Sequence, residues 1–245
     1  MKTISIMQPT YLPWMGYFSL INQVDIFVIY DDVQFDKRSW QQRNKIKTQS
    51  GTQWLTVPVL TKNKLSQKIN DVVISKELSF ERDHIKAIEV NYSKAPFFKK
   101  YKNEIFDCID NNHHKIIELN FSLIQKISDI LNIKTEFIKS SDLKNIDGKK
   151  DERLIRICKT LSANAYISPE GSKNYLGEGD SFQDNDIKLE YQMFEHPKYE
   201  QIYGSFESHM SIIDALFNCG SDKTFELIKE SSMISPTDRL EKIYD

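Results

Sequence analysis

The sequence predicts an α/β protein with a mainly parallel sheet, and three features of its first thirty residues support this prediction. Residues 3–7 are a strand candidate that ends before Pro9, because proline has no backbone N–H to donate across a sheet. Pro13 suits the first turn of a helix, and apolar residues follow it at helical spacing through residue 23. Residues 26–30 are an uninterrupted apolar run, which is typical of a strand buried on both faces. The order strand, helix, strand is that of a βαβ unit, so we expect a Rossmann-like fold.

Further strands and helices continue along the chain. Short apolar runs predict strands at residues 53–59, 71–74, 135–138, 165–168 and 187–194. Apolar residues that recur on one helix face predict helices at residues 80–92, 96–110, 113–132, 152–161, 210–218 and 222–231.

These elements fit one α/β domain over residues 1–232, with a helical insertion at about residues 80–132. Beyond it, Ser235 suits a helix cap and Pro236 the first helical position. We therefore expect a short helical tail over residues 233–245.

Composition excludes several classes of protein. Hydrophobic residues at 40% and charged residues at 28% are typical of a globular domain and not of a disordered chain. The formal net charge of −2 gives no general reason to expect a polyanionic partner. Cys108, Cys158 and Cys219 are widely spaced and form no metal-binding motif, so we expect reduced thiols and no metal. The longest apolar run near the N-terminus is far shorter than a membrane span, so we expect a cytoplasmic protein without membrane contact.

The first candidate site follows the first predicted strand. Residues 8–17 are dense in large aromatic side chains, which can stack on a base or a sugar. Alternatively, these rings cover the edge of the sheet. The candidate binding residues are Gln8, Tyr11, Trp14, Gly16 and Tyr17.

The second candidate site follows the buried strand that ends at Tyr30. Asp31 and Asp32 offer a pair of carboxylates for acid–base chemistry, and the basic residues that follow suit phosphate or carboxylate groups. A solvated charged loop is the alternative, although Trp40 and Trp54 are unusual in such a loop. The binding candidates here are Gln34, Arg38, Trp40, Arg43, Asn44 and Lys45.

The third candidate site follows the strand predicted at residues 165–168. Its hydroxyls, glycine and lysine are typical of an oxyanion or phosphate cradle, although they also fit an ordinary turn. The candidates are Ser168, Ser172, Lys173 and Tyr175. A fourth stretch adds Gln201 and two histidines, His196 and His209, that more often serve as surface or hydrogen-bonded residues than as bases.

Four blocks of the sequence resemble the WbqC-like protein family. They are QPTYLPWMGYFSLINQVDIFVIYDDVQFDKRSWQQRNKIK, WLTVPV, YISPEGSKNYL and HPKYEQIYGSFESHMSIIDALFNCG. The similarity runs from about Ile4 to about Gly220. It implies a bacterial protein of O-antigen or other surface-polysaccharide (lipopolysaccharide) biosynthesis. The implied activity is an N-acyltransferase reaction in which an acyl or aminoacyl group, glycyl included, goes to the amine of a nucleotide-linked amino sugar.

A more distant similarity links residues 7–35 to the nucleotidyltransferase and pantothenate-synthetase group. Gly16 matches the glycine of that group's His-x-Gly-His motif, but Trp14 and Tyr17 stand in place of the two histidines. The similarity therefore supports the fold and not adenylyl transfer.

Acyl transfer to an amine requires a base for the nucleophile and hydrogen-bond donors for the oxyanion. We expect Asp32, or else Asp31, to be the base, and Ser168, Ser172 and Lys173 to be the donors. Arg38, Arg43 and Lys45 would hold the diphosphate of a UDP- or dTDP-linked sugar. A single pocket would be lined by Tyr11, Trp14, Asp32, Arg43, Ser168 and Tyr175.

Neither the acyl donor nor the reaction class is fixed by these residues. Coenzyme A thioesters, an acyl carrier protein and an aminoacyl-tRNA all remain open as donors, and no cofactor is predicted. An ATP-dependent ligase or nucleotidyltransferase that uses Arg43 and Lys173 is an alternative. A non-catalytic sugar-nucleotide binding protein is another. The oligomeric state is open.

Overall fold

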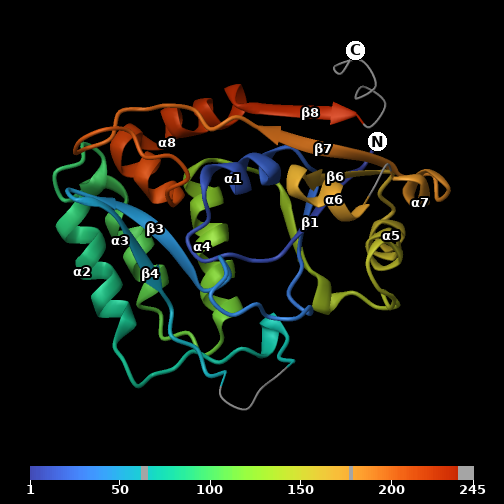
Figure 1. Ribbon diagram of the computed structural model, residues 1–245, viewed down its shortest axis with the longest axis horizontal. Coiled ribbons are helices and arrows are strands. Elements are labelled where there is room, and N and C mark those ends of the chain that lie inside the picture. Colours follow the sequence, from blue (N-terminus) through green and yellow to red (C-terminus); the bar gives the residue numbers. More distant parts are fainter. Residues whose placement is uncertain (62–65, 177–178, 237–245) are drawn as a thin grey trace.

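A six-stranded sheet runs through the molecule in the order β5-β2-β1-β6-β7-β8 (Figure 1). The computed structural model describes residues 1–61, 66–176 and 179–236. Strands β5, β2, β1, β6 and β7 are all parallel, and β8 pairs with β7 in the antiparallel sense. The predicted parallel sheet is therefore confirmed. The strands are β1 (Thr3–Met7), β2 (Ile26–Ile29), β5 (Glu136–Lys139), β6 (Ala165–Pro169), β7 (Lys188–Phe194) and β8 (Ser232–Pro236).

Helices cover both faces of the sheet. They are α1 (Met15–Asn22), α2 (Phe80–Tyr92), α3 (Phe98–Ile109), α4 (Ile116–Ile130), α5 (Asp151–Thr160), α6 (Lys173–Leu176), α7 (Asp180–Gln183) and α8 (Ile212–Glu230). Figure 1 places α2 and α3 at one end of the molecule and α5 and α7 at the other. Helices α2 to α4 lie between β2 and β5 in the chain, where the helical insertion is predicted.

Alternate residues of the strands belong to two separate cores. Ile26 and Val28 of β2 pack in the core that contains α5 and α7. Phe27 and Ile29 pack in the larger core that contains α1, α4 and α8. Because side chains alternate across a strand, the apolar run of β2 is buried on both faces, as its sequence predicts.

Helix α8 joins the two helices predicted at residues 210–218 and 222–231. The backbone leaves helical geometry at Gly220, which has φ 80°. A β-carbon there would lie 2.9 Å from the ring of Phe97, so the kink and the close packing both require glycine.

A second, two-stranded sheet differs from the prediction. Strands β3 (Arg43–Thr48) and β4 (Gly51–Thr56) form an antiparallel hairpin, whereas the sequence indicates a polar loop followed by a strand at residues 53–59. Arginine and lysine stand at alternate positions of β3. They obscure the alternation of apolar and polar residues by which a strand is recognised in a sequence. Residues 71–74 form only isolated bridges, through Val73 and Ile74. A short 3-10 turn, Ile69–Asp71, ends at the first of these residues.

The predicted helical tail is wrong where the structure describes it. Residues 232–236 form β8 instead, because the outer edge of β7 has backbone groups that need partners. Residues 237–245 of the predicted tail lie outside the described part of the chain.

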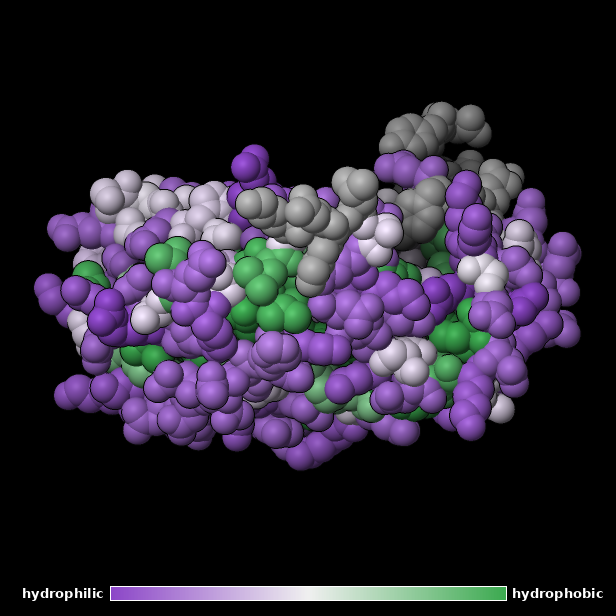
Figure 2. Space-filling view, turned by 90° about the horizontal axis from the view of Figure 1, so that it is seen from below, coloured by the Kyte–Doolittle hydropathy of each residue, from purple (hydrophilic) through white to green (hydrophobic). Residues whose placement is uncertain are grey.

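No helix in the described part of the chain is both long and apolar enough to cross a membrane. The face seen in Figure 2 is mostly hydrophilic, with hydrophobic residues in separate patches.

Candidate ligand-binding cleft

The carboxyl ends of β1 and β6 form the natural binding position of this sheet. From β1 the chain builds the sheet outward through β2 and β5, and it then returns to the other side of β1 to form β6 and β7. In open α/β sheets such a reversal of strand order leaves a crevice at the carboxyl ends, where ligands bind. A cavity of about 550 Å³ opens there. It is lined by Ile6, Met7, Gln8, Thr10, Tyr30, Asp36, Ser39, Trp40, Gln41, Lys150, Leu154, Tyr166, Pro169, Gly171 and Ser172.

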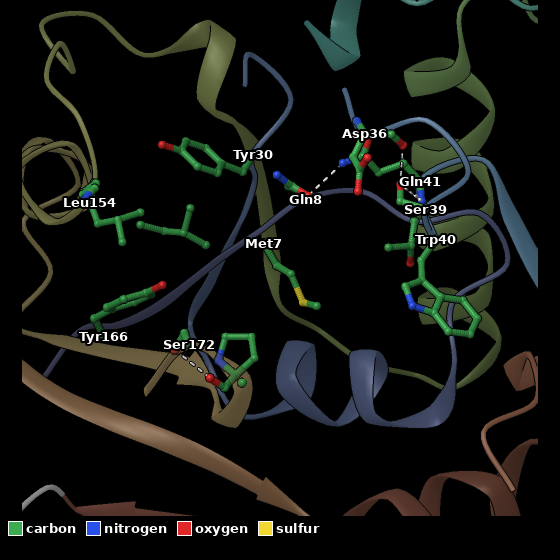
Figure 3. A pocket seen from close by; sticks show the side chains of 15 residues that line it. Met7, Gln8, Tyr30, Asp36, Ser39, Trp40, Gln41, Leu154, Tyr166 and Ser172 are labelled. Atoms are coloured by element: carbon green, nitrogen blue, oxygen red, sulfur yellow. Dashed lines mark hydrogen bonds between the residues drawn. The ribbon is translucent and has the colours of Figure 1, made fainter. Parts of the chain in front are cut away.

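This larger cavity has two unlike walls, with Gln8 between them (Figure 3). Tyr30, Leu154 and Tyr166 form an aromatic and aliphatic wall. The turn of residues 36–41 faces them with polar side chains. A ligand in this cavity would meet ring faces on one side and hydrogen-bonding groups on the other.

A smaller cavity of about 260 Å³ adjoins the larger one. Met7, Thr10 and Trp40 line both, so the two cavities are adjacent, and we call them together the cleft. The further residues that line the smaller cavity are Trp14, Tyr17, Asn44 and His209.

Hydrogen bonds fix the turn of residues 36–41 in place. The Gln41 side chain donates from Nε2 to Gln8 Oε1 at 2.8 Å and accepts from the Asp36 backbone N–H at 3.0 Å. The Ser39 hydroxyl donates to the Asp36 carbonyl at 2.6 Å. The polar wall is therefore preorganised before any ligand binds.

Thr10 stands at the junction of the two cavities. Its hydroxyl oxygen is buried and has no hydrogen-bond partner among the described residues. Buried hydroxyls almost always have a partner, so this one would gain a hydrogen bond if the Thr10 side chain turned it toward a group in the cleft.

Two histidines flank the smaller cavity. The His209 ring stacks on Trp14, with centroids 5.2 Å apart, and lies 5.0 Å from the His196 ring. Burial lowers the pKa of His196, and the neighbouring His209 lowers it further. His209 has φ 58°, a sparsely populated conformation that is often found at functional sites. Sequence analysis names this residue only as a minor candidate, and the fold brings it to the cleft.

Asp31 and Asp32 instead form a hydrogen-bonded cluster with Ser140, Ser141 and Arg153, which we call the aspartate cluster. Asp31 is 1% exposed and accepts from the Ser140 hydroxyl at 3.1 Å, the Ser141 N–H at 3.0 Å and the Ser141 hydroxyl at 2.7 Å. Asp32 accepts from the Ser140 hydroxyl at 2.5 Å and from the Arg153 guanidinium. Neither carboxylate lines the cleft. The prediction of a free base here is corrected, because the residues after β5 use these oxygens.

Tyr11 and Gly16 pack inside the protein. The Tyr11 ring is fully buried, and its hydroxyl lies 2.8 Å from His84 Nδ1, so it cannot stack on a ligand as predicted. The same burial lowers the pKa of His84 to about 4. A β-carbon on Gly16 would lie 2.3 Å from Trp14 Cη2, so this glycine makes room for the tryptophan.

The third predicted site reaches the cleft through one side chain. Ser172 lines the larger cavity, whereas Ser168 is fully buried and bonds to Ser172 at 2.6 Å and to the Tyr166 hydroxyl at 3.1 Å. Lys173 lies over the Tyr191 ring at 5.2 Å, outside the cleft lining. Tyr175 belongs to α6, but its side chain lies outside the described ones.

Gln201 belongs to a hydrogen-bond network within the protein and does not line the cleft. It donates to Asp214 Oδ1 at 2.8 Å and accepts from Lys47 Nζ at 2.9 Å. Burial raises the pKa of Asp214. This network ties α8 to strand β3.

The remaining predicted residues lie outside the cleft lining. Gln34 and Arg38 are exposed. Arg43 and Lys45 pack on the ring of Trp54 in the hairpin.

The cleft thus gathers part of the predicted set and adds others. The predicted residues that line it are Gln8, Trp14, Tyr17, Trp40, Asn44 and Ser172. Among the unpredicted ones, Tyr30 directly follows β2, a position that the sequence does mark. Leu154 comes from α5 and Lys150 directly precedes this helix, and neither carries a local signal. No group of three or more acidic, cysteine or histidine side chains in the described chain could hold a metal ion.

Comparisons with known proteins identify the family. The uncharacterized protein Rv1507c of Mycobacterium tuberculosis (strain ATCC 25618 / H37Rv) is 38% identical over 224 residues, which cover 91% of this chain and 96% of that protein. No solved structure is a significant match. The model of the WbqC-like protein family matches residues 8–226, so the chain belongs to this family.

Proposed function

We propose that the cleft binds a nucleotide-linked amino sugar and that the protein transfers an acyl or aminoacyl group to the sugar amine. The observation that carries this proposal is the two-part cleft at the reversal of strand order, where α/β proteins hold nucleotides. The larger cavity, about 550 Å³, falls within the roughly 300–1,000 Å³ of small-molecule sites. The proposal keeps the expectation of a cytoplasmic protein.

The larger cavity suits a sugar. Tyr30, which is half-buried, offers its ring to the apolar side of a pyranose. Gln8, Ser39 and Ser172 offer donors and acceptors to its hydroxyls.

His209 is the group in the cleft best suited to act as the base. Imidazole exchanges protons near neutral pH, and a sugar amine must lose a proton as it attacks. The Asp32 carboxylate is already bonded to Arg153 and Ser140. We therefore assign the role that the sequence suggested for Asp32 to His209.

The reaction follows from these positions. The amine nitrogen attacks the acyl carbonyl, and the proton leaves the nitrogen for His209. The Thr10 side chain would turn its buried hydroxyl toward the junction of the cavities and donate to the oxyanion there. As the bond from the acyl carbon to the donor's sulfur or oxygen breaks, the imidazolium returns the proton to that leaving group.

Calorimetric titration tests the binding step. UDP- or dTDP-linked amino sugars should bind with dissociation constants within roughly 1 µM–1 mM, the usual range of KM. Gly171 lines the larger cavity, and a β-carbon on it would meet nothing within 4 Å. Gly171→Phe should therefore fill the cavity and weaken binding at least tenfold, and Gly171→Ala is the matched control.

Mass spectrometry of the sugar product tests the transfer step, with coenzyme A thioesters, acyl carrier protein and aminoacyl-tRNA as donors. Tight binding of ATP without binding of nucleotide sugars would favour a ligase instead. Binding without turnover with every donor would favour a non-catalytic binding protein.

A further inference from the structure

We propose that the rim of the cleft holds the nucleoside diphosphate half of the substrate on a platform made of Trp40, Trp54, Arg43 and Lys45. The base would stack on the tryptophans, and the diphosphate would pair with the two cations. This inference rests on the proposed function, because it places one half of the same substrate. We call these four residues the tryptophan platform.

The two tryptophans are exposed side by side. Trp40 is 46% exposed and Trp54 is 41% exposed, and their ring centroids lie 5.3 Å apart. Tryptophan usually has most of its surface buried, and exposed aromatic surface is a mark of binding sites. The protein therefore leaves part of both rings uncovered, and a base requires such flat apolar surface.

The hairpin sets the two cations on Trp54. In the register of β3 and β4, Lys45 pairs directly with Trp54, and Arg43 pairs with Thr56 two residues further along. Arg43 Cζ lies 4.3 Å from the centroid of the Trp54 ring, and Lys45 Nζ lies 5.1 Å from it. Cation–π contact holds both charges close to the stacking surface.

Neither cation has a carboxylate partner in the part of the chain that the structure describes. Among the described residues, no carboxylate forms an ion pair with Arg43 or Lys45. Arg153, in contrast, pairs with Asp32. Two cations without a carboxylate partner among the described residues, beside two exposed tryptophans, suit a ligand that has both an aromatic ring and an anionic group. A carbohydrate without a nucleotide has neither.

Trp40 connects the platform to the cleft. It contacts Trp54 and also lines both cavities. The platform therefore adjoins the cavities, as the binding site for a nucleotide joined to a sugar must.

Fluorescence titration of the full chain tests the platform, because two of the protein's three tryptophans belong to it. UDP and dTDP should quench this fluorescence. Trp54→Ala should weaken UDP binding about tenfold or more, the scale of base stacking. It should weaken uridine binding by a similar factor.

Arg43→Ala separates the two contributions. It should weaken UDP binding about tenfold, because a charge-assisted pair with phosphate is lost, and leave uridine binding nearly unchanged. Arg82→Ala is the matched control, because this arginine is exposed on α2, with 82% of its side-chain surface accessible. Unchanged thermal unfolding would show that each variant is folded.

The outcomes separate the two proposals. UDP affinity that is unchanged in both platform variants would overturn the platform but leave nucleotide-sugar binding standing. Absence of any binding of UDP, dTDP and their amino sugars to the unmodified protein would overturn the proposed function. Quenching by oligouridylate but not by UDP would overturn the platform as a substrate site in favour of a nucleic-acid partner.

Discussion

The same edge of the sheet has a closed region and an open region. At the ends of β2 and β5, the aspartate cluster satisfies both carboxylates with serine and arginine donors. At the ends of β1 and β6, the Thr10 hydroxyl has no partner among the described residues and a cavity of about 550 Å³ remains. The carboxylates that the sequence singles out therefore lie in the closed region, and the cavity lies in the open region.

One arginine joins the two regions. Arg153 bonds to Asp32, and its guanidinium lies 5.1 Å from the centroid of the Tyr30 ring. Tyr30 lines the larger cavity. The aspartate cluster therefore contacts a wall of the cleft through Arg153.

The largest loss of stability should come from removing a carboxylate of the aspartate cluster. Asp31→Ala should lower the free energy of unfolding by about 3 kcal/mol, because three donors lose a buried charged acceptor. Asp36→Ala, in the open region, should change it by less than about 0.5 kcal/mol, because the hydrogen bonds of Asp36 use its backbone. Urea unfolding measures both variants.

If Asp31→Ala does not fold, Asp31→Asn keeps one acceptor oxygen and should show a smaller loss. Equal stability of the Asp31 and Asp36 variants would contradict the distinction between the two regions.

The second prediction concerns the buried pair of Tyr11 and His84. The folded-state pKa of His84 is about 4, against 6.5 for the unfolded chain. As pH falls through 6.5 toward 4, the unfolded state binds a proton that the folded state does not, so stability is lost in this window. Between pH 7.5 and 4.5 the loss from His84 should be about 2.5 kcal/mol.

His84→Gln should remove this part of the pH dependence in urea unfolding. If the free energy of unfolding depends on pH in the variant as it does in the unmodified protein, then His84, and with it Tyr11, is accessible to solvent.

The third prediction concerns the floor of the smaller cavity. Gly16→Ala should destabilise the protein by about 1–3 kcal/mol, because Trp14 must move away from the new methyl group. Since Trp14 lines the cavity, ligand affinity should fall as well. Thermal unfolding together with calorimetry tests this, and an unchanged melting temperature would speak against the packing role of Gly16.

The smallest effect on stability should come from the open region itself. Thr10→Val removes a hydroxyl without a partner and should change the free energy of unfolding by no more than about 0.5 kcal/mol. Turnover should nevertheless fall about 10²–10³-fold, the usual cost of losing one oxyanion donor. A variant that is much less stable would mean that the hydroxyl serves the fold.

The sheet could be predicted from sequence because its signals are local. The apolar run that became β2 and the helical stripes of α2 to α4 each specify one element. Strand β8 could not be predicted, because it forms only through pairing with β7, far away in the sequence.

The site was predictable only in part, for the same reason. The sequence identifies the strand ends, so Gln8, Trp40 and Ser172 were found. It does not reveal that Ser140 and Ser141, more than a hundred residues later, occupy the oxygens of Asp31. Whether a carboxylate is free or used is decided by distant parts of the chain.

The central claim is that the substrate binds at the ends of β1 and β6. A crystal structure of the protein with a UDP- or dTDP-linked amino sugar tests it most directly. We expect the sugar between Tyr30 and the turn of residues 36–41, with its amine directed toward His209. Density for the ligand against Asp31 and Asp32 at the ends of β2 and β5 would contradict it.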